Sequence, residues 1–216
     1  MLLNKGDTIL FVGDSITDCN RNRATNIYAW APLQHGNGYV SDVEAELVCE
    51  HTDLQIGVLN MGISDNTIRD LKERWQTDVL DWKPDWVFVF IGINDVWKSF
   101  QYPNVAHRWI QLEEYEKTYR ELLDQTVDQV KGVILVTPYY LETNRSDPMR
   151  MRMEQFGDIV RGLAKEYGLR LLDMQKAWDA FLEKVTTQQI SYDRVHPNHV
   201  GHVFMAKQIM KLLESE

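Results

Sequence analysis

The sequence predicts an α/β protein in which helices cover both faces of a central parallel sheet of about five strands. Along its 216 residues, short apolar runs alternate with longer stretches whose apolar residues have helical spacing. The run 86–91 is apolar at every position, which is typical of a strand with both faces buried. Because no break in composition divides the chain, we expect a single domain spanning residues 1–216.

The individual elements follow from this alternation. Five apolar runs of strand length are expected to form the sheet: 8–12, 54–59, 86–91, 133–136 and 169–173. The spacing of apolar residues predicts helices over about 39–50, 68–79, 112–130, 148–167, 175–185 and 203–212. Two stretches without a period, 19–37 and 97–109, carry several aromatic residues and are expected to be loops.

Composition, net charge and the cysteines indicate which partners and which cellular compartment to expect. Hydrophobic residues make up 44% of the chain and charged residues 25%, which is typical of a soluble globular protein. A formal net charge of −9 disfavours nucleic acid and anionic membranes as partners. The first apolar run is too short for a signal peptide, and Cys19 and Cys49 have no metal or disulfide spacing. We therefore expect a cytoplasmic location.

Polar residues follow three of the predicted strands where each strand ends. Ser15 closes a Gly-Asp-Ser triplet after the first strand, Gly62 lies in a turn signal after the second, and Asn94 follows the third. The carboxyl ends of parallel strands meet at one edge of a sheet, where α/β proteins bind their ligands. We therefore expect these three residues to lie together.

Ser15 and two distant residues match the requirements of acyl transfer. A serine nucleophile needs a base that takes its proton and a carboxylate that fixes the tautomer of that base. We expect His196 to be the base and Asp193, three residues earlier, to bond its other ring nitrogen. The N–H groups of Ser15 and Gly62 and the side-chain amide of Asn94 are the expected donors to the oxyanion.

The sequence blocks around these residues resemble those of a known family. Residues 13–15, Gly62, residues 92–95 and the pair Asp193 and His196, in that order, are similar to the four blocks of the SGNH or GDSL hydrolases. The resemblance spans nearly the whole chain. It implies a flavodoxin-like three-layer α/β/α sandwich and a serine hydrolase with a Ser-His-Asp triad, an acyl-enzyme and no cofactor.

The resemblance is closer to one group within this family. Residues 15–19, 92–97 and 193–197 are similar to the bacterial intracellular acetyl xylan esterases, which remove acetyl groups from xylo-oligosaccharides without a metal. Two positions depart from that pattern: Asp65 stands where glycine is expected, and Tyr192 stands where tryptophan is frequent. If position 65 needs a positive φ, aspartate tolerates it less well than glycine, so we expect an altered oxyanion loop.

Substrate contacts are expected from residues near these blocks. The candidates are Asp14, Tyr28, Trp30, Trp97 and Tyr192. Tyr28 and Trp30 form either a wall of the substrate site or a cover for the core, and Trp97 is a candidate for stacking on a sugar ring. Asp14 also fits a second role, in which it bonds loop backbone and caps the next helix.

Neither a metal nor a thiol is expected to take part in the chemistry. His196, His199 and His202 are spaced poorly for joint ligation on one helix, and no cysteine accompanies them. Cys19 is expected to be a small buried residue rather than a nucleophile. The sequence therefore predicts no metal site.

Two functional classes remain. The first is a serine esterase for a short acyl group on a polar alcohol, because the aromatic residues of the two loop stretches alternate with polar residues. The alternative within the same chemistry is a lysophospholipase, a thioesterase or a general lipolytic ester hydrolase. The second is a non-catalytic carbohydrate-binding protein, which an intact triad disfavours. The expected partner is a small ester, an acetylated oligosaccharide, and the aromatic residues favour a homo-oligomer.

Overall fold

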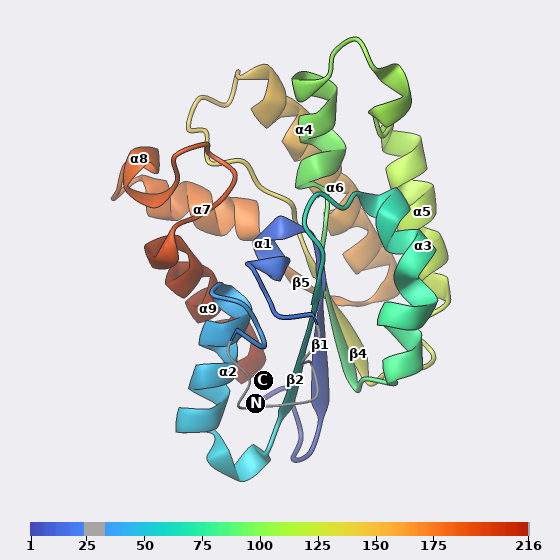
Figure 1. Ribbon diagram of the computed structural model, residues 1–216, viewed down its shortest axis with the longest axis vertical. Helices are drawn as coiled ribbons and strands as arrows, with labels where there is room; N and C mark the ends of the chain where they lie inside the picture. Colours follow the sequence, from blue (N-terminus) through green and yellow to red (C-terminus); the bar gives the residue numbers. More distant parts are fainter. Residues whose placement is uncertain (24–32, 216) are drawn as a thin grey trace.

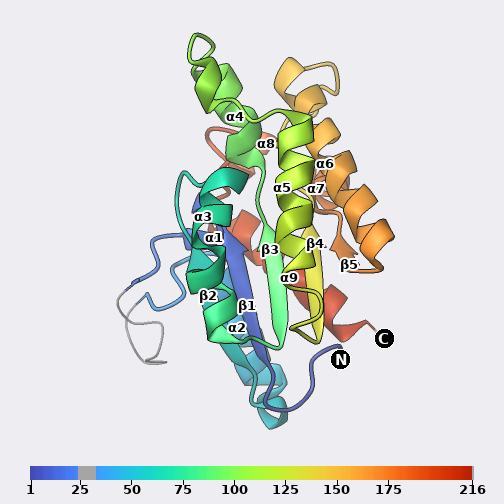
Figure 2. The ribbon, with the colours of Figure 1, turned by 90° about the vertical axis from the view of Figure 1, so that its right-hand side faces the viewer.

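The computed structural model describes residues 1–23 and 33–215, which contain a five-stranded sheet (Figures 1 and 2). Its strands are β1 (Thr8–Gly13), β2 (Gly57–Gly62), β3 (Trp86–Phe90), β4 (Gly132–Val136) and β5 (Arg170–Leu172). Neighbouring strands are parallel and lie in the order β2-β1-β3-β4-β5. This order is the flavodoxin-like one, so the predicted fold class is confirmed.

Helices cover both faces of the sheet. On one face, to the left in Figure 1, lie α2 (Tyr39–Glu50), α7 (Met174–Leu182) and α9 (His199–Glu214). On the other face lie α3 (Ile68–Asp78), α5 (Leu112–Asp124) and α6 (Pro148–Tyr167). Three 3₁₀ turns cover Thr52–Leu54, Leu80–Trp82 and Ala106–Arg108. Among the described residues, no helix is long and apolar enough to cross a bilayer.

Three helices lie toward the carboxyl ends of the strands: α1 (Ser15–Asp18), α4 (Ile93–Gln101) and α8 (Thr187–Ile190). In Figure 1, α4 is near the top, α1 is near the centre and α8 is at the left edge. The strand order reverses between β1 and β3, and α1 and α4 follow these two strands. In open parallel sheets, ligands bind in the crevice at such a reversal. The fold therefore places the residues after β1 and β3 at a ligand-binding edge.

The core lies between the sheet and the two helical layers. All five residues of β3 are buried, which explains the unbroken apolar run of this strand. Phe88 of β3 pairs in register with Phe11 of β1, and their ring centroids are 4.8 Å apart. Tyr39 of α2 packs 5.9 Å from Phe11. Burial of one such side chain contributes about 1.5–3 kcal/mol, so this cluster fixes α2 and both strands in place.

Two element boundaries differ from the sequence-based prediction and affect the site. β2 extends to Gly62, whereas the predicted strand ends at residue 59. Helix α4 covers the first part of the segment 97–109, for which the sequence predicts a loop. Gly92, with a φ of 134°, ends β3 in a conformation that side chains rarely adopt and allows a helix to begin at Ile93. Gly62 therefore belongs to the sheet, and Asn94 belongs to a helix.

Candidate active site

Ser15 is the first residue of α1 and is separated from the end of β1 only by Asp14. Asp14 caps this helix, because its Oδ1 accepts from the N–H of Ile16 at 3.0 Å. Gly13 permits the close exit from the strand, since a Cβ there would lie 2.3 Å from the carbonyl oxygen of Phe90. The Ser15 side chain is half-buried, and no group in residues 1–23 and 33–215 accepts a hydrogen bond from its N–H.

His196 joins Ser15 to Asp193 through two hydrogen bonds. Ser15 Oγ lies 2.9 Å from His196 Nε2, and His196 Nδ1 lies 2.7 Å from Asp193 Oδ2. Asp193 Oδ1 accepts from the N–H groups of Val195 and His196 and from the hydroxyl of Ser191.

These hydrogen bonds determine where the protons lie on Asp193 and His196. Burial would raise the pKa of Asp193, but the bonds from the His196 side chain and from the backbone outweigh burial and lower that pKa. The ionised carboxylate can only accept, so the hydrogen of the neutral His196 ring is on Nδ1. Nε2 is then free to accept the Ser15 hydroxyl proton, which is the arrangement a serine nucleophile needs.

Asn94 lies in the first turn of α4 and faces the loop of residues 63–67 between β2 and α3. Its Nδ2 donates to the carbonyl oxygen of Asn66 at 3.0 Å, which leaves a second amide hydrogen for another acceptor. The next residue, Asp95, accepts from the N–H of Ile68 at 2.9 Å. Two adjacent residues of α4 therefore hold the end of this loop and the start of α3, and one hydrogen of the buried Asn94 amide has no acceptor among the described residues.

Gly62, which the sequence analysis assigned to the oxyanion hole, does not offer its N–H to the site. As the last residue of β2, it donates that N–H to Asn60 Oδ1 at 2.9 Å. Its Cα also packs on α1 so closely that a Cβ would lie 2.2 Å from the backbone nitrogen of Asp18. This glycine is required by strand packing, not by access of a substrate to the backbone.

Asp65 differs from Gly62 in its backbone conformation and in its N–H. Its φ is 69°, so the positive φ considered for this position is present on a residue other than glycine. None of the described residues accepts from the Asp65 N–H. In the sequence, position 65 stands out only as a departure from the family pattern, whereas the turn signal after the second strand favours Gly62 as the donor.

Two hollows meet at His196. The first, of about 380 Å³, is lined by Ser15, His196, Cys19 and Ser64 among others. The second, of about 300 Å³, also borders His196 and is lined in part by Tyr192. Both are small and have polar residues in their walls, which suits a short acyl group on a polar alcohol.

The five residues considered for substrate contact have different surroundings. The Trp97 ring lies 5.8 Å from the His196 ring, centroid to centroid, and the Tyr192 side chain is 91% exposed beside the triad. Asp14 is buried and its carboxylate caps α1, so it positions Ser15 rather than lining a hollow. Tyr28 and Trp30 lie outside the described residues.

Cys19 lines the first hollow as a neutral thiol. His202 accepts from the N–H of Tyr39 at Nδ1, so its Nε2 carries the hydrogen and donates to Cys19 Sγ at 3.2 Å. Burial, with nearby carboxylates, raises the pKa of Cys19 to about 12, and burial lowers the pKa of His202 to about 4. No group of three potential metal ligands occurs among the described His, Cys, Asp and Glu residues.

Arg74 of α3 is a supporting residue that the sequence analysis missed. Its side chain is 13% exposed. The guanidinium donates to the carbonyl oxygens of Gly13 and Met61 and to Asn66 Oδ1, and it also pairs with Asp78. It thereby ties the ends of β1 and β2 to the 63–67 loop. The sequence around Arg74 does not predict this role, because most arginines on amphipathic helices are exposed to solvent.

Comparison with protein families and curated relatives agrees with this geometry. The family described as GDSL-like Lipase/Acylhydrolase matches residues 11–204. A curated relative, the acetylxylan esterase of Geobacillus stearothermophilus, is 43% identical over 211 residues, a match that spans 98% of this chain and 95% of the relative.

Solved structures agree as well. LAE5, an α/β hydrolase enzyme from the metagenome of Lake Arreo in Spain, matches with a TM-score of 0.96 and 41% identity over 99% of this chain and 97% of that chain. Axe2, an acetylxylan esterase from Geobacillus stearothermophilus, matches with a TM-score of 0.95 and 42% identity over 100% and 98% of the two chains. The chain therefore belongs to the GDSL-like lipase/acylhydrolase family and is a carboxylic ester hydrolase.

Proposed function

We propose that this chain is a serine esterase that removes O-acetyl groups from xylo-oligosaccharides or related carbohydrates. The observation that carries the mechanism is the continuous hydrogen-bonded chain from Ser15 through His196 to Asp193. The substrate class rests on the 43% identity to an acetylxylan esterase and on the small, polar hollows beside His196.

Acylation begins at the Ser15 hydroxyl. Ser15 Oγ attacks the acetyl carbonyl carbon while His196 Nε2 takes the hydroxyl proton, and Asp193 stabilises the imidazolium that forms. The carbonyl oxygen becomes an oxyanion, which accepts from the N–H groups of Ser15 and Asp65 and from the unused hydrogen of Asn94 Nδ2. When this intermediate collapses, His196 returns the proton to the sugar oxygen, and the deacetylated sugar leaves.

Deacylation repeats these steps with water. His196 Nε2 takes a proton from a water molecule, the resulting hydroxide attacks the acetyl group on Ser15, and the same three donors receive the second oxyanion. Collapse returns the proton from His196 to Ser15 Oγ and releases acetic acid, which gives up its own proton to water and becomes acetate. We assign the sugar to the faces of Trp97 and Tyr192, which flank His196.

Two further properties stay proposals. Cys19 and Cys49 are free thiols, which fits a reducing compartment and supports a cytoplasmic location. Self-association into a homo-oligomer stays a prediction, motivated by exposed apolar side chains such as Tyr192 and Phe100.

The test is a comparison of ester substrates with the wild-type protein and Ser15→Ala. Hydrolysis of p-nitrophenyl esters from acetate to octanoate is measured beside release of acetate from fully acetylated xylobiose. We expect cleavage of the acetate and the sugar ester, little cleavage of octanoate, and no turnover by Ser15→Ala. A preference for octanoate would replace the carbohydrate assignment by a lipid or thioester hydrolase.

A further inference from the structure

Asp65 holds a conformation that its side chain disfavours. Its φ of 69° lies in the left-handed region, where a Cβ crowds the backbone and which only glycine enters freely. The residue is also 80% exposed at its side chain, so packing around the side chain does not impose this conformation. Contacts of the loop backbone hold it there, among them the hydrogen bond from the Asn66 N–H to the Ile63 carbonyl oxygen, which is 3.3 Å long and closes a turn around Asp65.

Lys98 of α4 adds a contact to Asp65 itself. Its Nζ donates to the Asp65 carbonyl oxygen at 2.7 Å and lies 3.1 Å from Asp65 Oδ2, so one ammonium group binds both the backbone and the side chain of the same residue. The Lys98 side chain is only 14% exposed, which strengthens a charged hydrogen bond relative to one in open water.

Lys98 and Asn94 act on neighbouring residues of the loop. They lie four residues apart on α4 and therefore on the same face of this helix. Asn94 donates to the carbonyl oxygen of Asn66, and Lys98 donates to that of Asp65. One helical face thus sets the orientation of two successive peptide groups in the loop.

We propose that Lys98 is a positioning residue that holds the Asp65 N–H in the oxyanion hole and compensates for the absence of glycine at position 65. The inference rests on the proposed esterase function. Without the ammonium group, Asp65 relaxes toward a negative φ, which turns its N–H away from the developing oxyanion. Because that donor acts when charge develops, its loss lowers kcat more than it changes KM.

A pair of backgrounds tests this role. Lys98→Met keeps the length of the side chain and removes the ammonium group, and we expect kcat with p-nitrophenyl acetate to fall about tenfold while KM changes by less than about twofold. In the Asp65→Gly background, the same Lys98→Met substitution should change kcat by less than about twofold, because glycine adopts a positive φ without help.

Two more variants separate backbone conformation from charge. Asp65→Ala and Asp65→Gly both remove the carboxylate, but only glycine favours a positive φ, so we expect Asp65→Gly to keep about tenfold more kcat than Asp65→Ala. Lys72→Met is the matched control: Lys72 pairs with Glu121 through a 2.6 Å contact away from the site, and its loss should leave kcat and KM unchanged.

The outcomes are distinct. An equal loss of kcat on Lys98→Met in both backgrounds would contradict the proposal, as would no loss in either or equal activity of Asp65→Ala and Asp65→Gly. A wild-type protein that cleaves no acetyl ester would instead remove the proposed function itself and, with it, this role of Lys98.

Discussion

Strand β1 has a buried aspartate at each end, and the pKa values of the two carboxyl groups are shifted in opposite directions. Before the strand, Asp7 accepts from Lys131 Nζ at 2.6 Å, from the Asn4 N–H and from Trp86 Nε1. Burial would raise the pKa of Asp7, but these bonds outweigh it and lower the pKa. After the strand, burial raises the pKa of Asp14 to about 7 against a hydrogen bond from the backbone.

This contrast extends to the other polar groups at the amino and carboxyl ends of the strands. At the amino end, the buried charge meets a cation and hydrogen-bond donors. At the carboxyl end, Asp14 and Asp95 both have pKa values raised to about 7 by burial, and Asp95 Oδ2 has no hydrogen-bond partner among the described residues. Two carboxyl groups with raised pKa values thus lie at the end of the sheet where the substrate and the oxyanion are proposed to bind, as expected at functional sites.

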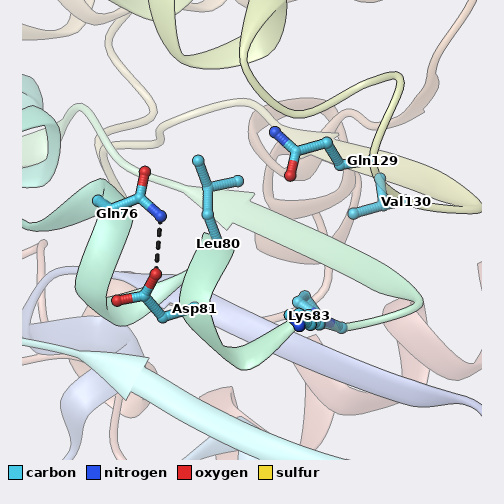
Figure 3. Close-up of a pocket in the computed structure, with 7 residues that line it drawn as sticks. Gln76, Leu80, Asp81, Lys83, Gln129 and Val130 are labelled. Carbon is cyan, nitrogen blue, oxygen red and sulfur yellow. Dashed lines mark hydrogen bonds between the residues drawn. The ribbon is translucent and has the colours of Figure 1, made fainter.

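The hollows at the two ends of the strands also differ in their lining residues. The hollow at the amino end, shown in Figure 3, measures about 610 Å³ and is larger than the one of about 380 Å³ beside Ser15. Its described lining is Gln76, Leu80, Asp81, Lys83, Pro84, Gln129 and Val130. Gln76 Nε2 donates to Asp81 Oδ1 at 2.7 Å, but the lining has no nucleophile bonded to a base. The carboxyl end therefore differs from the amino end by its serine hydrogen-bonded to a histidine, and not by the volume of its hollow.

The largest expected effect is at the carboxyl end. His196→Ala removes the base that takes the Ser15 proton, so we expect kcat for acetyl esters to fall by about 10⁴-fold or more. His51→Ala is the matched control, because His51 bonds Glu214 at the far end of α2 and should not affect turnover. A His196→Ala protein that keeps a tenth of the wild-type kcat would contradict the comparison.

A smaller loss is expected from the oxyanion hole. Asn94→Ala removes one donor that acts mainly in the transition state, so kcat should fall about a hundredfold with little change in KM. Steady-state kinetics with p-nitrophenyl acetate measure both constants. If kcat is unchanged, the second Asn94 hydrogen does not meet the oxyanion.

At the amino end, we expect an effect on stability alone. Lys131→Met removes the cation that pairs with Asp7 and Asp85, which leaves buried Asp7 without its strongest partner. Tm should fall, while kcat of the folded protein stays within about twofold of wild type because the site lies at the other end of β1. A drop in kcat without a drop in Tm would break the distinction between the two ends.

The smallest effect concerns pH. Asp14 and Asp95 have folded pKa values of about 7 against an ordinary value of 3.8, so between these values the folded protein holds protons that the unfolded chain has lost. Their contribution to stability is fully present below about pH 4 and is lost as the pH rises through about 7. Asp95→Asn keeps an acceptor for the Ile68 N–H and removes one of the two titrating groups.

Calorimetry across this range measures the effect. We expect the wild-type Tm to fall between about pH 4.5 and 8, because two aspartates outweigh His202, whose lowered pKa of about 4 acts in the opposite direction. The fall should be clearly smaller in Asp95→Asn, where only Asp14 opposes His202. Equal slopes in the two proteins would show that Asp95 does not titrate in this window.

The sequence predicts some elements fully because their signals are local. The predicted helix 148–167 coincides with α6: Asp147 caps it, Pro148 occupies its first position, and Gly168 ends it with a φ of 65°. Ser15, Asp193 and His196 were likewise predictable, since each lies in a short, characteristic block.

Other parts of the site depend on contacts between distant segments. Gly62 reads as a turn glycine in the sequence, yet it is required because α1 packs against its Cα. Arg74 and Lys98 bind carbonyl oxygens of segments 13 to 61 residues away, and nothing in their own helices distinguishes them from solvated side chains. Such pairings arise only when the sheet brings the strand ends together.

The most direct test of the central claim is covalent labelling of the wild-type protein with a fluorophosphonate, followed by peptide mass mapping. We predict one adduct per chain, on Ser15, formed more slowly in the presence of acetylated xylobiose and absent from Ser15→Ala. Absence of an adduct, or an adduct on another serine, would contradict the assignment of catalysis to the carboxyl end of β1.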